Sequence, residues 1–413
     1  MIPTSLDWCQ TQDANDPLAP MKDRFDLPEG IIYMDGNSLG VLPKGVKERV
    51  ADVVSREWGT DLIKSWNTAD WINLPSRVGA KIAPLVGAKP SEVVMADSTS
   101  INIFKVAAAA CAMNKGRTKV ISEPGNFPTD LYMLQGLTEF LGPDYTLEIV
   151  DRDKIVDAID DNTAVVLLTH VHYVTADMFD MAGITKAAHD KGALMVWDLS
   201  HSTGAVPVDL NDAGADFAIG CGYKYLNGGP GAPAFVYVAE RHLGKAKQPL
   251  TGWFGHANPF DFVDTFRPAA DIRRMLVGTT GVLAASAFET ALEAFDGVDM
   301  QVVRKKSQAL TDLFIALCRE KLSGYGVGIV TNENPAKRGS HVSLSCDDGY
   351  AVVQALIERG VIGDFRAPNF MRFGFTPLYL GFEDTYRAVE IMAEIFQTGV
   401  WKEPRFSAKG AVT

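Results

Sequence analysis

The chain has 413 residues, of which 47% are hydrophobic, and a formal net charge of −12. This length is sufficient for two domains with a large core. The acidic balance, without a basic tail or stripe, argues against nucleic acid or an anionic membrane as the main partner.

The sequence shows no pattern typical of a signal peptide, a membrane-spanning segment or a metal site. The first ten residues lack the cationic and apolar regions of a signal peptide, and no apolar run is long enough to span a bilayer. The five cysteines are scattered without a CxxC spacing, which favours free thiols in a reducing cytoplasm. The histidines form no cluster with metal-ligand spacing, so we expect a cytoplasmic protein without a structural metal.

The first part of the chain, residues 1–60, is predicted to be an arm followed by a helix that extends over 43–63, because apolar side chains recur there at helical spacing. From about 93 to 280, short apolar runs alternate with amphipathic segments. The runs predict strands at 119–122, 146–150, 163–168, 193–197, 216–219 and 234–238. The segments between them predict helices at 151–159, 181–191 and 209–214. This alternation indicates a mostly parallel sheet with helices on both faces.

The C-terminal part of the sequence indicates a second, smaller unit. Helices are predicted at 281–295, 300–321, 350–359 and 383–398, and strands at 341–345 and 369–374. The predicted fold class is therefore α/β. We expect an N-terminal arm and helix over 1–60, a large domain over 61–285 and a small C-terminal α+β domain over 286–413.

Two of the predicted strands lead to side chains of opposite charge. The run 193–197 is followed by Asp198, and the run 216–219 leads to Lys224, which precedes a Gly-rich turn. The carboxyl ends of neighbouring parallel strands meet at one edge of a sheet, where α/β proteins place their sites. Pyridoxal phosphate needs a lysine that bonds to its aldehyde and a carboxylate that pairs with its pyridine nitrogen. We therefore expect this cofactor, although a lone lysine before such a turn is usually a surface residue.

Several further side chains suit the same cofactor. Thr99 and Ser100 stand at a predicted helix start, where backbone N–H groups bind a phosphate well, although ordinary helix capping is the simpler interpretation. Phe127 precedes another helix start and could stack on the pyridine ring. His201 could donate to the cofactor's phenolate oxygen or phosphate, or it could bond a loop carbonyl.

Arg372 lies in a predicted strand of the small domain. Its guanidinium matches the α-carboxylate of an amino acid in bidentate fashion. A strand arginine held in a salt bridge is the alternative interpretation.

With these residues assembled, the chain resembles the fold type I (aspartate-aminotransferase-like) enzymes that use pyridoxal phosphate, and among them the kynureninase family. The resemblance extends over roughly residues 5–400. The motifs that carry it are Tyr33–Gly40, Asn126–Asp130, His170–Thr175, Trp197–His201, Gly222–Gly231, Gly252–Gly255 and Met371–Gly374. It implies hydrolysis of L-kynurenine or 3-hydroxykynurenine to anthranilate or 3-hydroxyanthranilate and L-alanine. The preference between these substrates, and a role in tryptophan breakdown or in NAD biosynthesis, stay open.

The resemblance also implies residue roles. The residues that it places at the cofactor are Thr99, Ser100, Phe127, Pro128, Thr129, Asp130, Thr169, Asp198, His201, Tyr223 and Lys224. Tyr223 would donate its hydroxyl to the phosphate and, like Lys224, is a candidate for acid–base work, while Arg372 would bind the substrate. Trp253 and Thr279 would reach the cofactor of a neighbouring subunit, which implies a homodimer with shared sites. Some family members carry Asn at the position matched to Thr279.

Two other enzyme classes share the aspartate and the lysine. A cysteine desulfurase needs a nucleophilic cysteine on a flexible loop, and its candidate here, Cys346, is expected at the end of a strand. An aminotransferase would be distinguished by its product, because it forms a keto acid and no anthranilate. A regulator that senses pyridoxal phosphate would carry a basic helix-turn-helix extension, which the acidic N-terminal arm lacks.

Overall fold

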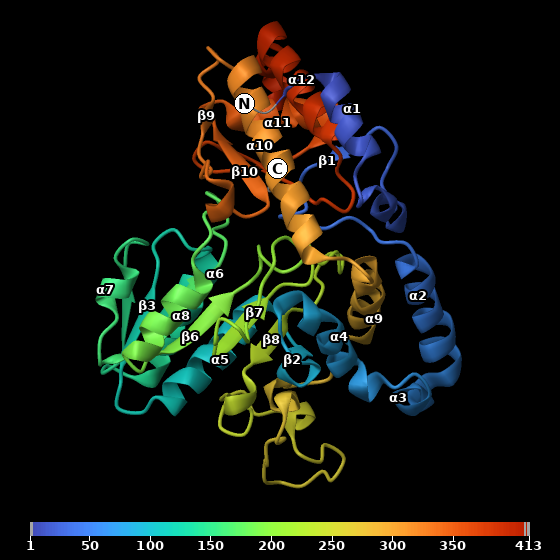
Figure 1. Ribbon diagram of the computed structural model, residues 1–413. Coiled ribbons are helices and arrows are strands. Elements are labelled where there is room, and N and C mark those ends of the chain that lie inside the picture. Colours follow the sequence, from blue (N-terminus) through green and yellow to red (C-terminus); the bar gives the residue numbers. More distant parts are fainter. Residues whose placement is uncertain (1–2, 409, 411–413) are drawn as a thin grey trace.

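A seven-stranded sheet forms the centre of this computed structural model, which describes residues 3–408 and 410 (Figure 1). The strand order is β2-β8-β7-β6-β5-β3-β4, and only β8 runs antiparallel to its neighbours. The strands are β2 (Val93–Met95), β3 (Lys119–Ser122), β4 (Thr146–Ile149), β5 (Thr163–Thr169), β6 (Leu194–Asp198), β7 (Phe217–Gly220) and β8 (Phe235–Val238). The prediction of a mostly parallel α/β sheet is confirmed.

Helices cover both faces of this sheet. Val196 of β6 belongs to the core formed with α5 (Thr99–Met113) and α6 (Pro128–Leu141). Its neighbours Met195 and Trp197 belong to the opposite core, which includes α8 (Met181–Asp190). Successive side chains of a strand point to opposite faces, so an unbroken apolar run supplies both cores.

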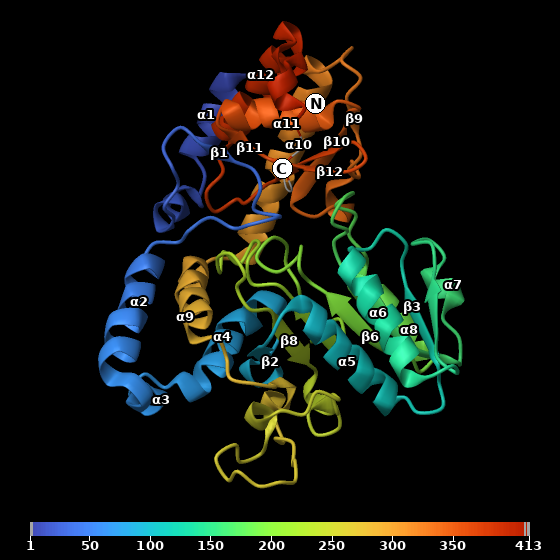
Figure 2. The same cartoon turned by 180° about the vertical axis from the view of Figure 1, so that it is seen from behind.

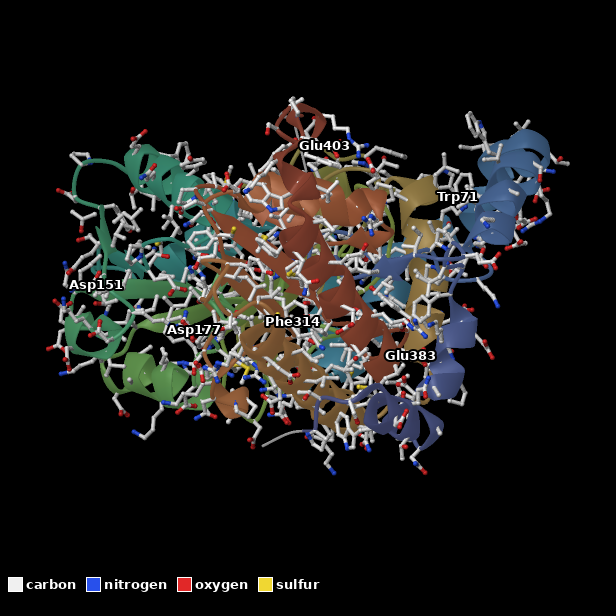
Figure 3. The ribbon with its side chains drawn as sticks, turned by 90° about the horizontal axis from the view of Figure 1, so that it is seen from above. Trp71, Asp151, Asp177, Phe314, Glu383 and Glu403 are labelled. Carbon is white, nitrogen blue, oxygen red and sulfur yellow. The ribbon has the colours of Figure 1, made fainter. Side chains whose placement is uncertain are left out.

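A four-stranded antiparallel sheet organises the C-terminal part. Its strands, in the order β12-β13-β10-β9, are β9 (Gly328–Ile329), β10 (His341–Ser345), β12 (Asp364–Arg366) and β13 (Phe370–Gly374). Phe373 packs on Phe314 of α10 (Met300–Lys321), with 5.2 Å between the ring centroids. Phe314 lies near the middle of the view in Figure 3, under helices α11 (Gly349–Glu358) and α12 (Phe382–Thr398). Arg372, next along β13, points to the other face of this sheet.

The N-terminal segment lies beside the C-terminal part, far away in sequence (Figure 2). Helix α1 (Leu6–Ala14) packs on α12, and β1 (Ile32–Tyr33) pairs in parallel with β11 (Val361–Ile362). The remaining α-helices are α2 (Val46–Asp52), α3 (Ser65–Thr68), α4 (Leu74–Ile82), α7 (Ile155–Ala158) and α9 (Val282–Ala291). The domain boundaries at 60/61 and 285/286 stay a prediction. None of the helices in the described ranges is both long and apolar enough to cross a bilayer.

Three predicted helices differ from the structure. The helix expected over 43–63 begins at Val46 and widens into a π-helix over Val53–Asp61. The wider turn rotates Val54 and Trp58 away from the protein, so they are 43% and 60% exposed. The segment 209–214 forms turns, because the Asp209 carboxylate accepts a hydrogen bond from the Asp212 N–H and competes with a helix. Only Ile155–Ala158 of the segment 151–159 is helical.

Candidate active site

Three neighbouring strands bring polar side chains to one edge of the large sheet. Thr169 ends β5, Asp198 ends β6, and Lys224 follows the end of β7. Thr169 and Asp198 are partners in the strand register, and β6 pairs with β7. Apart from the half-buried Leu194, every residue of these three strands is buried, so the strand ends fix the positions of the polar side chains found there.

These side chains share one cavity of about 140 Å³. Its lining includes most of the residues expected at the cofactor: Thr99, Ser100, Phe127, Thr129, Asp130, Thr169, Asp198, His201, Tyr223 and Lys224. Ser98, Tyr173 and Ser200 also line it, and no role was predicted for them. Tyr173 and Ser200 belong to the motifs His170–Thr175 and Trp197–His201, and this membership could have marked them as residues of the site.

One end of the cavity is suited to an anion. Helix α5 begins there, and the Ser98 hydroxyl caps it by accepting a hydrogen bond from the Ile101 N–H at 3.4 Å. The Ser100 and Thr129 hydroxyls lie 3.1 Å apart. Burial raises the pKa of Tyr223, so its hydroxyl keeps a proton that it can donate. Free N–H groups at a helix start, joined by hydroxyl donors, bind a phosphate well.

Two carboxyl groups meet at another side of the cavity. The Thr169 hydroxyl lies 3.2 Å from Asp130 Oδ2 and 3.4 Å from Asp198 Oδ2. Asp198 Oδ1 accepts hydrogen bonds from the Ser200 N–H at 2.8 Å and the Ser200 hydroxyl at 2.6 Å. Burial raises the pKa of both acids, and the nearby Asp198 charge raises that of Asp130 further, well above its usual range. Asp130 therefore holds a proton while Asp198 is the better candidate for the anion.

Lys224 and His201 form the third element of the cavity. Lys224 Nζ lies 2.9 Å from His201 Nε2. Burial, together with the charge of Lys224, lowers the pKa of His201 well below its usual range, so the imidazole is neutral. The Phe127 ring centroid lies 5.7 Å from Lys224 Nζ, and Tyr173 packs edge-on against Phe127.

The residues present fit pyridoxal phosphate. Asp130 Oδ1 and His201 Nδ1 are buried and have no hydrogen-bond partner within the described part of the chain, so each is available to a ligand. The start of α5 would hold the phosphate, Phe127 would cover a face of the ring, Asp198 would pair with the pyridine nitrogen, and Lys224 would bond to the aldehyde carbon.

Three expected cofactor residues lie outside the cavity lining. Pro128 opens helix α6 between two lining residues. The Trp253 indole packs edge-on against Trp66, with 6.2 Å between the ring centroids. Thr279 is exposed and lines a separate hollow beside Asp97. The expected roles of Trp253 and Thr279 involve a second subunit and stay predictions.

Arg372 lies beyond Tyr173 and already has partners. Its Nε donates to Asp364 Oδ1 at 2.7 Å, and its Nη2 donates to Asp364 Oδ2. Nη2 also donates to the Ser38 hydroxyl at 3.0 Å, and Nη1 donates to the Tyr173 carbonyl at 2.7 Å. A guanidinium has five N–H donors, so one Nη1 N–H is left for a substrate. Arg372 is therefore a strand arginine held in a salt bridge, as the alternative interpretation of the sequence expected. Its partner, Asp364, was not predicted from the sequence.

Comparison with known proteins identifies the family. A family model described as the kynureninase C-terminal domain matches residues 303–392. The kynureninase of Pseudomonas fluorescens is 48% identical over 415 residues, which cover 99% of this chain and 100% of the relative. The chain belongs to the kynureninase family. A kynureninase of Burkholderia mallei (strain SAVP1) is 49% identical over 97% of this chain and 98% of its own length.

Solved structures share the fold of this kynureninase family member at lower identity. The apo cysteine desulfurase of Thermococcus onnurineus NA1 matches with a TM-score of 0.77 and 20% identity, over 92% of this chain and 98% of that chain. A mutant of the cystine lyase C-DES, with glycine covalently linked to its pyridoxal phosphate, matches with a TM-score of 0.76 and 15% identity, over 90% of this chain and 98% of that chain. Such likeness shows the fold alone, and it confirms the fold type I class.

The desulfurase alternative is not supported at Cys346. This thiol is 6% exposed at the end of β10, and burial raises its pKa, which opposes the thiolate that a nucleophile needs. It does not line the cavity that holds Lys224. The relatives of high identity are kynureninases, whereas the desulfurase is a distant structural neighbour.

Proposed function

We propose that this protein is a hydrolase dependent on pyridoxal phosphate that cleaves the Cβ–Cγ bond of L-kynurenine to give anthranilate and L-alanine. One observation carries the proposal: a single cavity joins Lys224 to Asp198 and to the hydroxyl-rich start of α5. Identity of 48% along the whole chain to a kynureninase supports the choice of substrate. The name kynureninase describes the reaction of that relative. For the present protein, 3-hydroxykynurenine is the second substrate to compare with L-kynurenine.

The cofactor, when bound, supplies an electron sink for bond breaking at Cα and Cβ of the amino acid. The chain's own residues position the substrate and move protons. Lys224 Nζ is the group that would take the Cα proton, and the neutral His201 Nε2 would accept a hydrogen bond from that amine. The protonated Tyr223 hydroxyl is available as a donor beside the phosphate end, and Lys224 is the other candidate for this step.

Exposed apolar side chains support a homodimer with shared sites. One group lies on the π-helix, the turn after it and α9: Val54, Trp58, Leu62, Ile63 and Leu283. A second group, Phe260, Phe262 and Val263, is 56–80% exposed on the loop that extends from the large part away from the C-terminal part (Figure 1). Apolar patches of this kind mark protein interfaces. The buried free cysteines support a cytoplasmic location.

The reaction is tested by product analysis. Purified holoenzyme incubated with L-kynurenine should release fluorescent anthranilate and an equal amount of L-alanine, with no keto acid and, from cysteine, no sulfide. Production of a keto acid or of sulfide at a comparable rate would instead indicate an aminotransferase or a desulfurase. The values of kcat/KM for L-kynurenine and 3-hydroxykynurenine then define the substrate preference.

Shared sites are tested by subunit mixing. A Lys224→Ala chain and a Trp253→Ala chain should each have low activity alone. If Trp253 serves the partner's cofactor, mixed dimers regain one intact site and part of the activity. A lack of recovery in dimers shown to be mixed by mass spectrometry would contradict the shared site.

A further inference from the structure

Asp364 lies between two arginines outside the lining of the cavity that holds Lys224, and one of them, Arg372, donates to the carbonyl of the lining residue Tyr173. Arg372 occupies both carboxylate oxygens, and Arg366 Nη2 lies 2.7 Å from Asp364 Oδ2. The Ser38 hydroxyl donates to the same Oδ2 at 2.5 Å. Asp364 and Arg372 are each 2% exposed, whereas the Arg366 side chain is 37% exposed. The hydrogen bonds from Arg372 help to hold the pKa of Asp364 below its usual value, so Asp364 is charged.

The charges of these three residues decide what Arg372 can offer a ligand. Arg372 and Asp364 alone form a buried neutral pair, and such a pair attracts an anion weakly. Arg366 adds a second positive charge to the same carboxylate. The three side chains together therefore carry one uncompensated positive charge, which matches the single negative charge of an amino-acid α-carboxylate.

Asp35 is the other acid that faces this cluster. Its carboxyl group is buried next to Asp364, and burial raises its pKa to about 7. Below that pH the group is mostly neutral and leaves the positive charge of the cluster intact. The cluster is therefore best studied near pH 6, where the titration of Asp35 does not obscure the effect of the arginines.

We propose that Arg366 is a positioning residue for substrate carboxylate binding: it neutralises Asp364 and thereby leaves the charge of Arg372 available to the α-carboxylate. The inference rests on the proposed function of Arg372 as the carboxylate ligand. It assigns Arg366 a role that acts through Asp364, with no contact to the reacting atoms. The role depends on the charge of the side chain and not on the shape of the guanidinium.

The test compares two probes, one with a charged carboxylate and one with an uncharged amide in its place. L-Alanine and L-alaninamide are titrated into the holoenzyme near pH 6, and binding is followed by the absorbance of the cofactor. In Arg366→Gln we expect the Kd of L-alanine to rise about tenfold, with L-alaninamide changed less than about twofold. Arg366→Lys, which keeps the charge, should bind both probes within about threefold of the wild type. With L-kynurenine as substrate, KM should rise in Arg366→Gln while kcat stays within about twofold.

A matched control removes another arginine of the same part. Arg359→Gln changes the net charge equally at an exposed site that pairs with Glu394, and it should leave every constant unchanged. The inference is overturned if Arg366→Gln weakens both probes equally or neither, or if Arg366→Lys is as impaired as Arg366→Gln, each compared with the wild type for the same probe. These binding data require no turnover, so they are separate from a failure of the wild type to form anthranilate.

Discussion

Lys224 Nζ and His201 Nε2 lie 2.9 Å apart, both from loops that follow buried strands. The imidazole is neutral because burial lowers its pKa, so it can accept a hydrogen bond from the amine. A neutral acceptor fixes the direction of the lysine amine without adding a charge to the cavity.

This pair predicts a graded response at position 201. His201→Ala should lower kcat/KM by about tenfold, the effect of losing one hydrogen bond to a charged or catalytic group. His201→Gln retains an acceptor and should recover part of that loss. Steady-state anthranilate release measures both variants, and an equal loss in the two would show that hydrogen bonding to Lys224 is not the reason.

Lys224 itself is predicted to be indispensable. Lys224→Ala should abolish turnover and the near-visible absorbance of covalently held cofactor. The exposed Lys186→Ala is a suitable control, because Lys186 pairs only with Asp190 on its own helix in the described structure. A purified Lys224→Ala protein that forms anthranilate at the wild-type rate would disprove the assignment.

The two carboxyl groups should respond differently to amidation. Asp130 is expected to hold a proton, because burial and the neighbouring Asp198 raise its pKa. An amide is close in shape and charge to a protonated acid, so Asp130→Asn should lower kcat by less than about tenfold. Asp198→Asn removes the anion and should lower kcat by about a hundredfold or more. The opposite order, measured on holoenzyme with matched cofactor content, would reverse the roles of these acids.

Asp35 predicts a pH dependence of stability. Burial raises its pKa to about 7 in the folded protein, against an ordinary value near 4. The folded state therefore holds the proton more tightly than the unfolded state, and the free energy of unfolding falls as the pH rises through this interval. Glu123, whose pKa burial also raises to about 7, acts in the same direction.

Asp35→Asn should remove the contribution of Asp35 to the decrease in the free energy of unfolding with rising pH. Relative to the wild type, the variant should gain stability between about pH 5 and about pH 8, as measured by urea unfolding of the two proteins at both pH values. Glu123→Gln provides the parallel measurement at a site away from the arginine cluster. An Asp35→Asn protein with the wild-type pH slope would show that Asp35 titrates normally in the folded state.

Gly40 packs closely against the loop that carries Lys224, so a larger residue at this position should disturb that loop. A Cβ at this position would overlap the Lys224 carbonyl oxygen and lie 2.5 Å from the Asn227 side chain. Gly40→Ala should therefore destabilise the protein by about 1–3 kcal/mol and reduce cofactor affinity. Gly136→Ala, in helix α6, is the matched control, because its added Cβ meets nothing within 4 Å apart from the neighbouring backbone of its own helix. It should stabilise the protein by up to about 1 kcal/mol. Thermal unfolding and cofactor titration distinguish the two variants.

Much of the large sheet was predictable because its central strands β5, β6 and β7 are almost entirely buried and appear as unbroken apolar runs. The convergence of Asp198 and Lys224 followed from the same reasoning, since Asp198 ends one strand and Lys224 follows the end of its parallel neighbour. The Asp364–Arg372 pair was not predictable. It depends on the register of β12 against β13, and the three residues of β12 carry no periodic pattern. The turn of the π-helix at Val53 likewise has no signal in apolar spacing.

The pairing of β1 with β11 has a consequence for biosynthesis. Ile32 and Tyr33 leave the ribosome early, but their partners Val361 and Ile362 follow only after most of the chain has been made. The strands of the seven-stranded sheet are complete by Val238, so the cofactor cavity can assemble while the N-terminal segment still has no strand to join. Asp364 and Arg372 emerge in the same late stretch. A nascent chain would therefore contain every residue that lines the cavity around Lys224 well before it contained this arginine and its carboxylate partner.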